Sequence, residues 1–109
     1  MTVEHLASGS GFAPLALPDK DREILGAYVG DLLSWVMGRA KADDAWITIM
    51  SNLNVVAVAS LADVACVILA EGVMPDEELI RVAESKNVNL IASTLSSYET
   101  AVKISEILR

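Results

Sequence analysis

The chain has 109 residues, of which 53% are hydrophobic, and it carries a formal net charge of −7 at pH 7. This length suits one domain with a core of its own, so we expect a single domain over residues 1–109. The acidic balance argues against binding to nucleic acid or to an anionic membrane surface, because both present phosphates that attract Lys and Arg.

The N-terminal part of the chain has the weakest pattern. Residues 2–9 (TVEHLASG) allow a short helix that Thr2 caps and Gly9 ends. Residues 12–17 (FAPLAL) predict an edge strand, because Pro14 has no amide hydrogen to donate to a neighbouring strand. We expect an irregular strand region here, ahead of more regular units.

A strand and a helix are predicted next. Residues 22–30 (REILGAYVG) read as a strand that contains a glycine, and residues 31–41 (DLLSWVMGRAK) read as a helix that Asp31 can cap. The apolar stripe expected to face the core consists of Leu32, Leu33, Val36 and Met37.

Two further strands are predicted. Residues 45–50 (AWITIM) read as a short buried strand, and residues 65–70 (ACVILA) form an unbroken apolar run, which is typical of a sheet covered on both faces. The stretch between them, residues 51–63 (SNLNVVAVASLAD), has two readings. Its valines favour a strand by propensity, whereas its polar start and the need for a crossover between parallel strands favour a helix. We predict a helix.

The C-terminal part has the clearest pattern. A helix is predicted for residues 75–87, a strand for residues 88–93 and a last helix for residues 96–108. Ser96 and Glu99 have the spacing of a capping box at the start of that last helix. The residues expected on the buried faces are Leu79, Ile80, Val82 and Ala83 in the first helix, and Tyr98, Ala101, Val102, Ile104, Ser105 and Leu108 in the second.

The order of these elements predicts the fold class. Three strand–helix units after an irregular N-terminal strand region indicate a small α/β domain of three-layer type with a mainly parallel sheet. No apolar run reaches the length of about 18 residues that a membrane-spanning helix needs. The N-terminus lacks the basic and then apolar pattern of a signal peptide, so we expect a cytoplasmic protein.

Side chains that usually perform catalysis or bind metals are scarce. His5 and Cys66 are the only histidine and the only cysteine, which leaves no zinc site. Cys66 lies in an apolar run, where a thiol usually packs as a small hydrophobe. The common phosphate-binding and nucleophile motifs are absent. We therefore predict no catalytic residue, no metal and no cofactor.

Polar residues follow each of the last three predicted strands. In α/β sheets, ligands bind at the C-terminal ends of parallel strands, next to helix N-termini whose free N–H groups favour a polar guest. The alternative reading is that these side chains only cap the helices. The candidate ligand-binding residues are Ser51, Asn52, Asn54, Glu71, Gly72, Ser93, Thr94 and Ser96.

The high apolar content predicts contact with another copy or a partner, since a small domain has little interior in which to bury it. We expect a homodimer, the most common soluble oligomer. Trp35 and Trp46 each allow two readings, an interface anchor or a cap on the core.

Three stretches of the chain carry a family resemblance. They are YVGDLLSWVMGRA (28–40), WITIMSNLNVVAVASLADVACVILAEG (46–72) and PDEELIRVAESKNVNLIASTLSSYETA (75–101). Together they resemble the DRTGG domain family, a small α/β module related in fold to the N-terminal domain of bacterial HPr kinase/phosphorylase. The resemblance implies a dimeric, non-catalytic module that regulates. In this family it is often fused to CBS domains, to phosphotransacetylase or to other enzymes.

The residues that name the family are not all present. Its Asp-Arg pair is expected in the loop that here reads Ser51-Asn52-Leu53-Asn54, and its Thr-Gly-Gly corresponds to Ala70-Glu71-Gly72. An arginine that could hold an anion is lost and an acid is gained, which disfavours a phosphate ligand of the usual kind. We predict a regulatory, ligand-sensing homodimer that modulates a metabolic enzyme. The alternative is a ligand-free adaptor that docks on an enzyme complex.

Overall fold

Five strands form one sheet, in the order β1-β5-β4-β3-β2, in the computed structural model, which describes residues 1–108. β1 (Phe12–Ala16) is an edge strand and runs antiparallel to β5 (Leu90–Ser93). The other neighbours, β5 with β4 (Cys66–Leu69), β4 with β3 (Asp44–Thr48) and β3 with β2 (Gly26–Val29), are parallel. The predicted mainly parallel sheet is confirmed, and β2 extends its parallel part to four strands.

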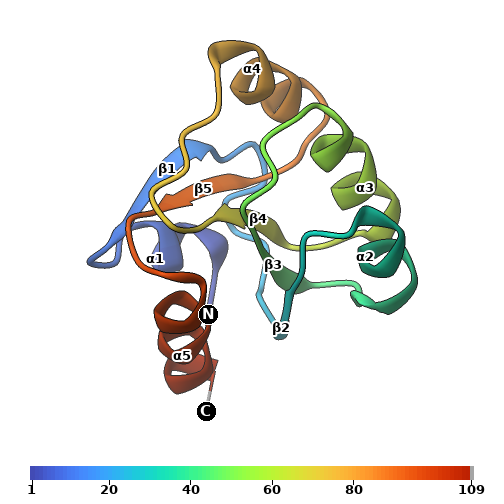
Figure 1. Cartoon of the computed structure of the whole chain (residues 1–109). Helices are drawn as coiled ribbons and strands as arrows, with labels where there is room; N and C mark the ends of the chain where they lie inside the picture. Colours follow the sequence, from blue (N-terminus) through green and yellow to red (C-terminus); the bar gives the residue numbers. More distant parts are fainter. Residues whose placement is uncertain (109) are drawn as a thin grey trace.

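Helices cover both faces of this sheet (Figure 1). α2 (Leu33–Arg39), α3 (Asn54–Ala62) and α4 (Glu77–Ser85) pack on one face, and α1 (Val3–Ala7) and α5 (Ser97–Leu108) pack on the other. The three-layer prediction is therefore confirmed. None of the helices within residues 1–108 is long and apolar enough to cross a membrane.

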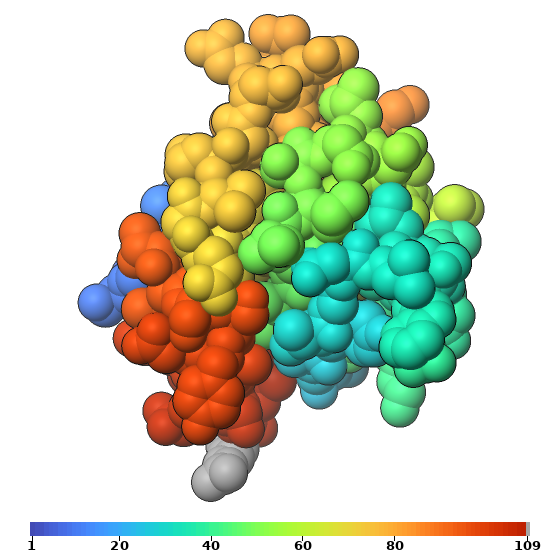
Figure 2. Space-filling view, in the orientation of Figure 1, coloured from blue at the N-terminus to red at the C-terminus, as the bar shows by residue number. Residues whose placement is uncertain are grey.

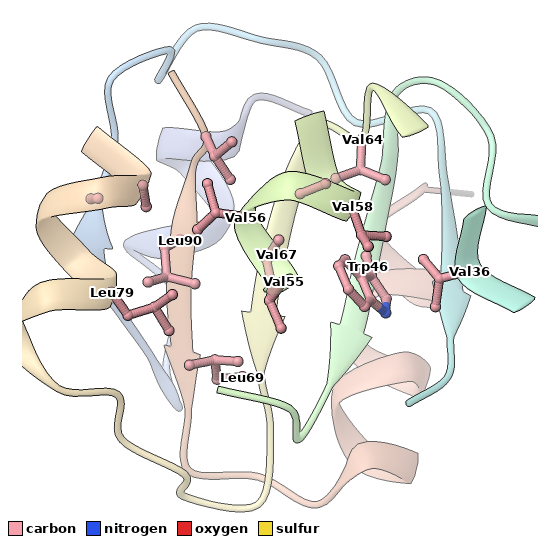
Figure 3. Close-up of a cluster of buried hydrophobic side chains, with 14 residues drawn as sticks. Val36, Trp46, Val55, Val56, Val58, Val64, Val67, Leu69, Leu79 and Leu90 are labelled. Carbon is pink, nitrogen blue, oxygen red and sulfur yellow. The ribbon is translucent and has the colours of Figure 1, made fainter. Parts of the chain in front are cut away.

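Side chains along each strand alternate between two hydrophobic clusters, as the period of a β-strand requires. On β3, Trp46 belongs to the cluster under α2, α3 and α4, whereas Ile47 belongs to the cluster under α1 and α5. On β4, Val67 and Ile68 divide in the same way. Figure 3 shows the first cluster, with Trp46 and Val36 at one end and Leu79 at the other. Burial on both faces explains why β4 reads as an unbroken apolar run and why the centre of β3 is apolar.

Residues 51–63, which had two readings, contain the helix α3. Val55, Val56, Val58 and Ala59 are buried in the first cluster, so tertiary packing outweighs the β-propensity of valine. The crossover between β3 and β4 therefore takes the predicted form. The short helix α1 is also confirmed, and the side chain of Thr2 accepts a hydrogen bond from the amide of His5 at its N-terminus.

Two predictions about helix α2 are wrong. Its N-cap position is Leu32, which makes no side-chain capping hydrogen bond, and Asp31 binds elsewhere. Of the predicted stripe, only Val36 is fully buried, while Leu32 and Met37 are 58% and 44% exposed. Leu32 and Met37 stay exposed because α2 lies beside β2, the last strand at this side of the sheet, where few other described residues can pack against it.

The predicted buried face of α5 is also partly wrong. Tyr98 is 78% exposed and Val102 37% exposed, and Ser105 is exposed as well. The residues that face the sheet are Thr100 and Ile104, with the hydroxyl of Thr100 hydrogen-bonded at 2.9 Å to that of Ser93. A buried polar pair thus sets the rotation of this helix. In α4, the predicted face is confirmed by the burial of Leu79 and Ala83.

Candidate functional site

The predicted ligand-binding residues lie in or next to the turns that follow β3, β4 and β5, which we call the first, second and third corner. These corners lie at the same edge of the sheet, because the three strands are parallel. The corner after β4 is hydrogen-bonded to the corner after β5, because the amide of Glu71 donates to the carbonyl of Leu95 at 2.8 Å and that of Gly72 donates to Ser93 at 3.0 Å. The amide of Ala70 donates to the carbonyl at the end of β3, at 3.0 Å. The structure therefore brings the predicted residues of the second and third corners together.

Glu71 occupies a specific position between these corners. Its φ is 62° and that of Gly72 is 73°, so two consecutive residues adopt a left-handed conformation. This turn directs the Glu71 carboxylate to the N-terminus of α5, where Oε2 accepts a hydrogen bond of 2.6 Å from the amide of Ser97. Free amides at a helix N-terminus favour an anion. In this chain, the carboxylate of Glu71 supplies that anion.

The polar residues after β5 are hydrogen-bonded within the fold. Ser93 is 1% exposed, and its hydroxyl bonds with that of Thr100. The Ser96 hydroxyl accepts from the amide of Glu99 at 3.0 Å, and the Ser96 amide donates to the Glu99 carboxylate at 3.3 Å, which confirms the capping box. Thr94 is exposed, and its amide donates to the carbonyl of Gly11 at 2.9 Å. The Ser96 hydroxyl therefore caps α5, and the Ser93 hydroxyl is hydrogen-bonded in the interior, so neither requires a ligand.

The corner after β3 leaves its polar groups more accessible. The Asn52 side chain accepts a hydrogen bond of 2.9 Å from the amide of Asn54, a local turn that leads into α3. Asn52 and Asn54 are exposed, and Ser51 is half-buried. Among the predicted residues, Ser51, Asn52 and Asn54 have the amide and hydroxyl groups that are most accessible to a ligand.

Asp31 also belongs to this edge, although the sequence reading placed it at the start of a helix. Its Oδ1 accepts hydrogen bonds from the Thr48 hydroxyl at 2.8 Å and from the amide of Ile49 at 3.0 Å. The carboxylate thus joins the loop after β2 to the end of β3. An acid directly after a predicted strand was the available signal, but the same signal is typical of a helix cap.

An ion-pair cluster lies at the other ends of the parallel strands, where the strands begin, and the sequence did not indicate it. Arg22 binds Asp43 Oδ1 through Nε at 3.0 Å and through Nη2 at 2.9 Å, and Nη2 also lies 2.9 Å from Asp63 Oδ1. Partial burial by itself would lower the pKa of Arg22, but the hydrogen bonds to Asp43 and Asp63 raise it overall. A cavity of about 130 Å³ beside this cluster is also lined by Lys86 and Asn87. The cluster joins three chain segments and lies away from the predicted corners.

Groups with catalytic chemistry remain few in the part of the chain that the structure describes. Cys66 is fully buried, and this burial raises the pKa of its thiol to about 12, so the nucleophilic thiolate is disfavoured. His5 is exposed on α1. Within residues 1–108, no three His, Cys, Asp or Glu side chains are grouped to hold a metal ion.

The two tryptophans differ in their burial. Trp46 is completely buried, and its indole nitrogen donates to the carbonyl of Gly30 at 2.9 Å. Trp35 is 52% exposed, and the guanidinium of Arg39 lies 3.7 Å from the centroid of its ring. Trp46 is therefore a core residue, whereas Trp35 lies on the surface.

Comparison with known proteins gave two findings. Residues 22–107 match the sequence model of the DRTGG domain. The structure is similar to the crystal structure of the CBS and DRTGG domains of the regulatory region of Clostridium perfringens pyrophosphatase, complexed with its activator diadenosine tetraphosphate. The TM-score is 0.66 at 13% identity, over 92% of this chain and 47% of that one. This chain thus spans about half of that structure, and at this identity the likeness shows the fold. No curated protein sequence matches the chain.

Proposed function

The chain belongs to the DRTGG domain family, and from this premise we propose that it is a non-catalytic regulatory module that binds a small molecule and modulates a metabolic enzyme. It acts as a homodimer in the cytoplasm. Family membership supports a regulatory role, and the pyrophosphatase region of similar fold was crystallised with a nucleotide activator. The ligand site is the edge of the sheet where the three corners meet.

The observation that carries this proposal is the hydrogen bond between Glu71 and the N-terminus of α5. A guest that donates a hydrogen bond to the Glu71 carboxylate would compete with the Ser97 amide and so alter the contact that holds α5 to the β4 corner. The exposed side chains of Asn52 and Asn54 lie at the neighbouring corner and offer further polar groups. Ligand binding would in this way be coupled to the position of a helix.

The same observation indicates the chemistry of the ligand. A phosphate near Glu71 would face the carboxylate already bound at the helix N-terminus, and like charges repel at short range. An amine or a hydroxyl would instead donate to that carboxylate. We therefore expect a ligand whose contact with this corner is through donor groups, because Glu71 stands where the family's Thr-Gly-Gly would have its first glycine.

The test is thermal unfolding of the purified protein against nucleosides, nucleotides, polyamines, acyl phosphates and coenzyme A derivatives. A ligand that binds only the native state raises the midpoint in a saturable manner. The Asn52→Ala/Asn54→Ala double variant should lose that rise, whereas Ser60→Ala, an exposed change in the last turn of α3, should keep it. A flat response to all these classes, or an equal rise in both variants, would contradict a ligand site at this edge.

A second candidate function is a ligand-free adaptor that docks on an enzyme complex. The hydroxyls of Ser93 and Ser96 already make hydrogen bonds within the fold. No ligand is needed to satisfy them, and this favours the adaptor. The adaptor predicts a flat response in the same panel together with a stable complex with an enzyme. The sensor predicts the saturable rise, so one experiment separates the two functions.

A further inference from the structure

Large apolar side chains are exposed around β2 and α2. Among the described residues, twelve large hydrophobic side chains are exposed, and five of them fall within residues 24–38. These five are Leu25, Val29, Leu32, Trp35 and Met37, with exposed fractions between 44% and 72%. We call them, with the outer edge of β2, the β2–α2 surface. In Figure 2 this part of the chain, cyan and teal, lies beside the green loop that follows β3.

The segment that forms most of the β2–α2 surface has little charge in a strongly charged chain, although the guanidinium of Arg39 lies over one side of the Trp35 ring. Residues 24–38 contain one charged residue, Asp31, and its Oδ1 is hydrogen-bonded to Thr48 and Ile49. The whole chain has 15 acidic and 8 basic residues. Two copies with a net charge of −7 each repel one another, so they approach most easily where charge is lacking. This favours a second copy, rather than a charged partner, as the occupant.

The edge of β2 is unprotected, in contrast to the other edge of the sheet. β2 pairs only with β3 among the described strands, and its residues Gly26–Val29 include no charged residue and no proline. β1, at the far edge, carries Pro14 and a shift in register after it. Prolines and register irregularities are ways in which proteins prevent edge-to-edge pairing. The chain applies them to β1. On the β2 side, the N-terminal segment pairs with Glu23 just before the strand, and Gly26–Val29 has no outer strand partner among the described residues.

Trp35 has the properties of an anchor in such an interface. Its ring is held from one side by the guanidinium of Arg39 at 3.7 Å, and 52% of its surface is still exposed. A large ring that is already fixed loses little conformational freedom on binding, which is why aromatic residues are frequent at the centres of interfaces. The cation–π contact also places Arg39 at the border of the apolar area.

We propose that two copies of this chain associate through the β2–α2 surface, with their β2 strands paired antiparallel across a two-fold axis. Antiparallel pairing of identical edges is self-complementary, as a two-fold contact requires. The two sheets join into one of ten strands, and the exposed side chains on both sides of β2 become covered. This inference rests on the homodimer of the proposed function and names its surface, but it does not depend on a ligand.

The first test measures the mass in solution by light scattering over a range of concentrations. The wild-type chain should have twice its mass of 11.6 kDa. Val29→Glu and Trp35→Glu should each weaken association at least tenfold, because they place a charge in the interface. Leu61→Glu is the matched control, since Leu61 is 73% exposed on α3. Circular dichroism should show all three variants folded, because none of these side chains is buried.

The second test uses disulfide formation. Cys66 is buried, so a cysteine introduced on the surface is the reactive one. Directly opposed residues of antiparallel strands have Cα atoms about 4.5–5.5 Å apart, within the range that a disulfide spans. Only the residue on the two-fold axis faces its own copy, so one of the single variants that cover the possible axis positions should cross-link rapidly: Leu25→Cys, Gly26→Cys, Ala27→Cys, Tyr28→Cys and Val29→Cys. Leu61→Cys should not, and the wild-type chain should give no covalent dimer.

The possible outcomes separate this inference from the proposed function. A dimer that persists in Val29→Glu and Trp35→Glu would place the interface elsewhere and overturn the inference, but not the homodimer. A wild-type monomer would overturn both, while leaving the ligand panel as an independent test of the sensor. A monomer that binds an enzyme, and loses this binding in Trp35→Glu, would assign the surface to that partner and also overturn the inference.

Discussion

The carboxylate of Glu71 accepts a hydrogen bond of 2.6 Å from the backbone amide of Ser97, the first residue of α5. Glu71 reaches this position with a φ of 62°, a conformation that costs about 1–2 kcal/mol for a residue with a Cβ. The carboxylate gains the favourable field at the helix N-terminus. One residue therefore combines an unfavourable backbone with a favourable electrostatic contact, and substitutions can separate the two effects.

Substitutions at Glu71 should rank in a specific order. Glu71→Ala removes the contact and keeps the left-handed backbone, so we expect a loss of about 1 kcal/mol in the free energy of unfolding. Glu71→Gly removes the same contact but relieves the backbone, and it should be close to wild type. Glu71→Gln, which keeps an acceptor without the charge, should lie between them. Urea denaturation measures all three, and equal losses in the alanine and glycine variants would contradict the role of the backbone.

Asp31 should matter for stability through its oxygen rather than through its charge. Its Oδ1 accepts from Thr48 and from Ile49, so Asp31→Ala leaves two donors without their partner and should cost about 1–2 kcal/mol. Asp31→Asn retains an oxygen in the same place and should lose less than half as much. A loss of the same size in both variants would show that the charge, and not the acceptor, is what stabilises the end of β3.

The long, regular parts of the fold were predictable from the sequence. The run at residues 65–70 is apolar throughout because the strand is buried on both faces, and residues 75–87 have the helical period because α4 is buried on one face. Both patterns can be recognised from residues that are close together in the sequence. The family resemblance was also confirmed, by the match over residues 22–107.

The contacts that were missed depend on which strands become neighbours. Asp31 could cap a helix or bind Thr48, and only the parallel pairing of β2 with β3 decides between the two. Glu71 and Ser97 are 26 positions apart and meet because β4 pairs with β5. The rotation of α5 follows from a buried hydroxyl, that of Thr100, which a search for apolar faces passes over.

Asn89 should tolerate neither a charged nor an apolar replacement. It is 2% exposed, its Nδ2 donates to the carbonyls of Asp19 and Ala65 at 2.8 and 2.9 Å, and its Oδ1 accepts from the amide of Asp19. Asn89→Leu loses all three bonds and should cost about 2–3 kcal/mol. Asn89→Asp has the same shape but places a carboxylate oxygen against two carbonyl oxygens, so it should cost more at neutral pH.

Acid provides a control for the Asn89 variants. Protonation gives the carboxyl of Asn89→Asp a hydrogen that it can donate, whereas the leucine variant has nothing to titrate. The difference in unfolding free energy between the two should therefore shrink from pH 7 to pH 4. Chemical denaturation at both pH values measures it. An unchanged difference would show that packing, and not the missing donor, explains the loss.

The buried thiol of Cys66 should make stability depend on pH in the alkaline range. Burial raises its pKa from 9.0 to about 12, so the folded state keeps a proton that the unfolded state releases. The resulting contribution is complete below pH 9 and is lost as the pH rises towards 12. Within this window, wild-type stability should fall relative to Cys66→Ala by about 1.4 kcal/mol per pH unit. The comparison cancels the lysines and tyrosines, which both proteins share. Urea denaturation between pH 8 and about 10.5 measures the difference, and a constant difference would contradict the raised pKa.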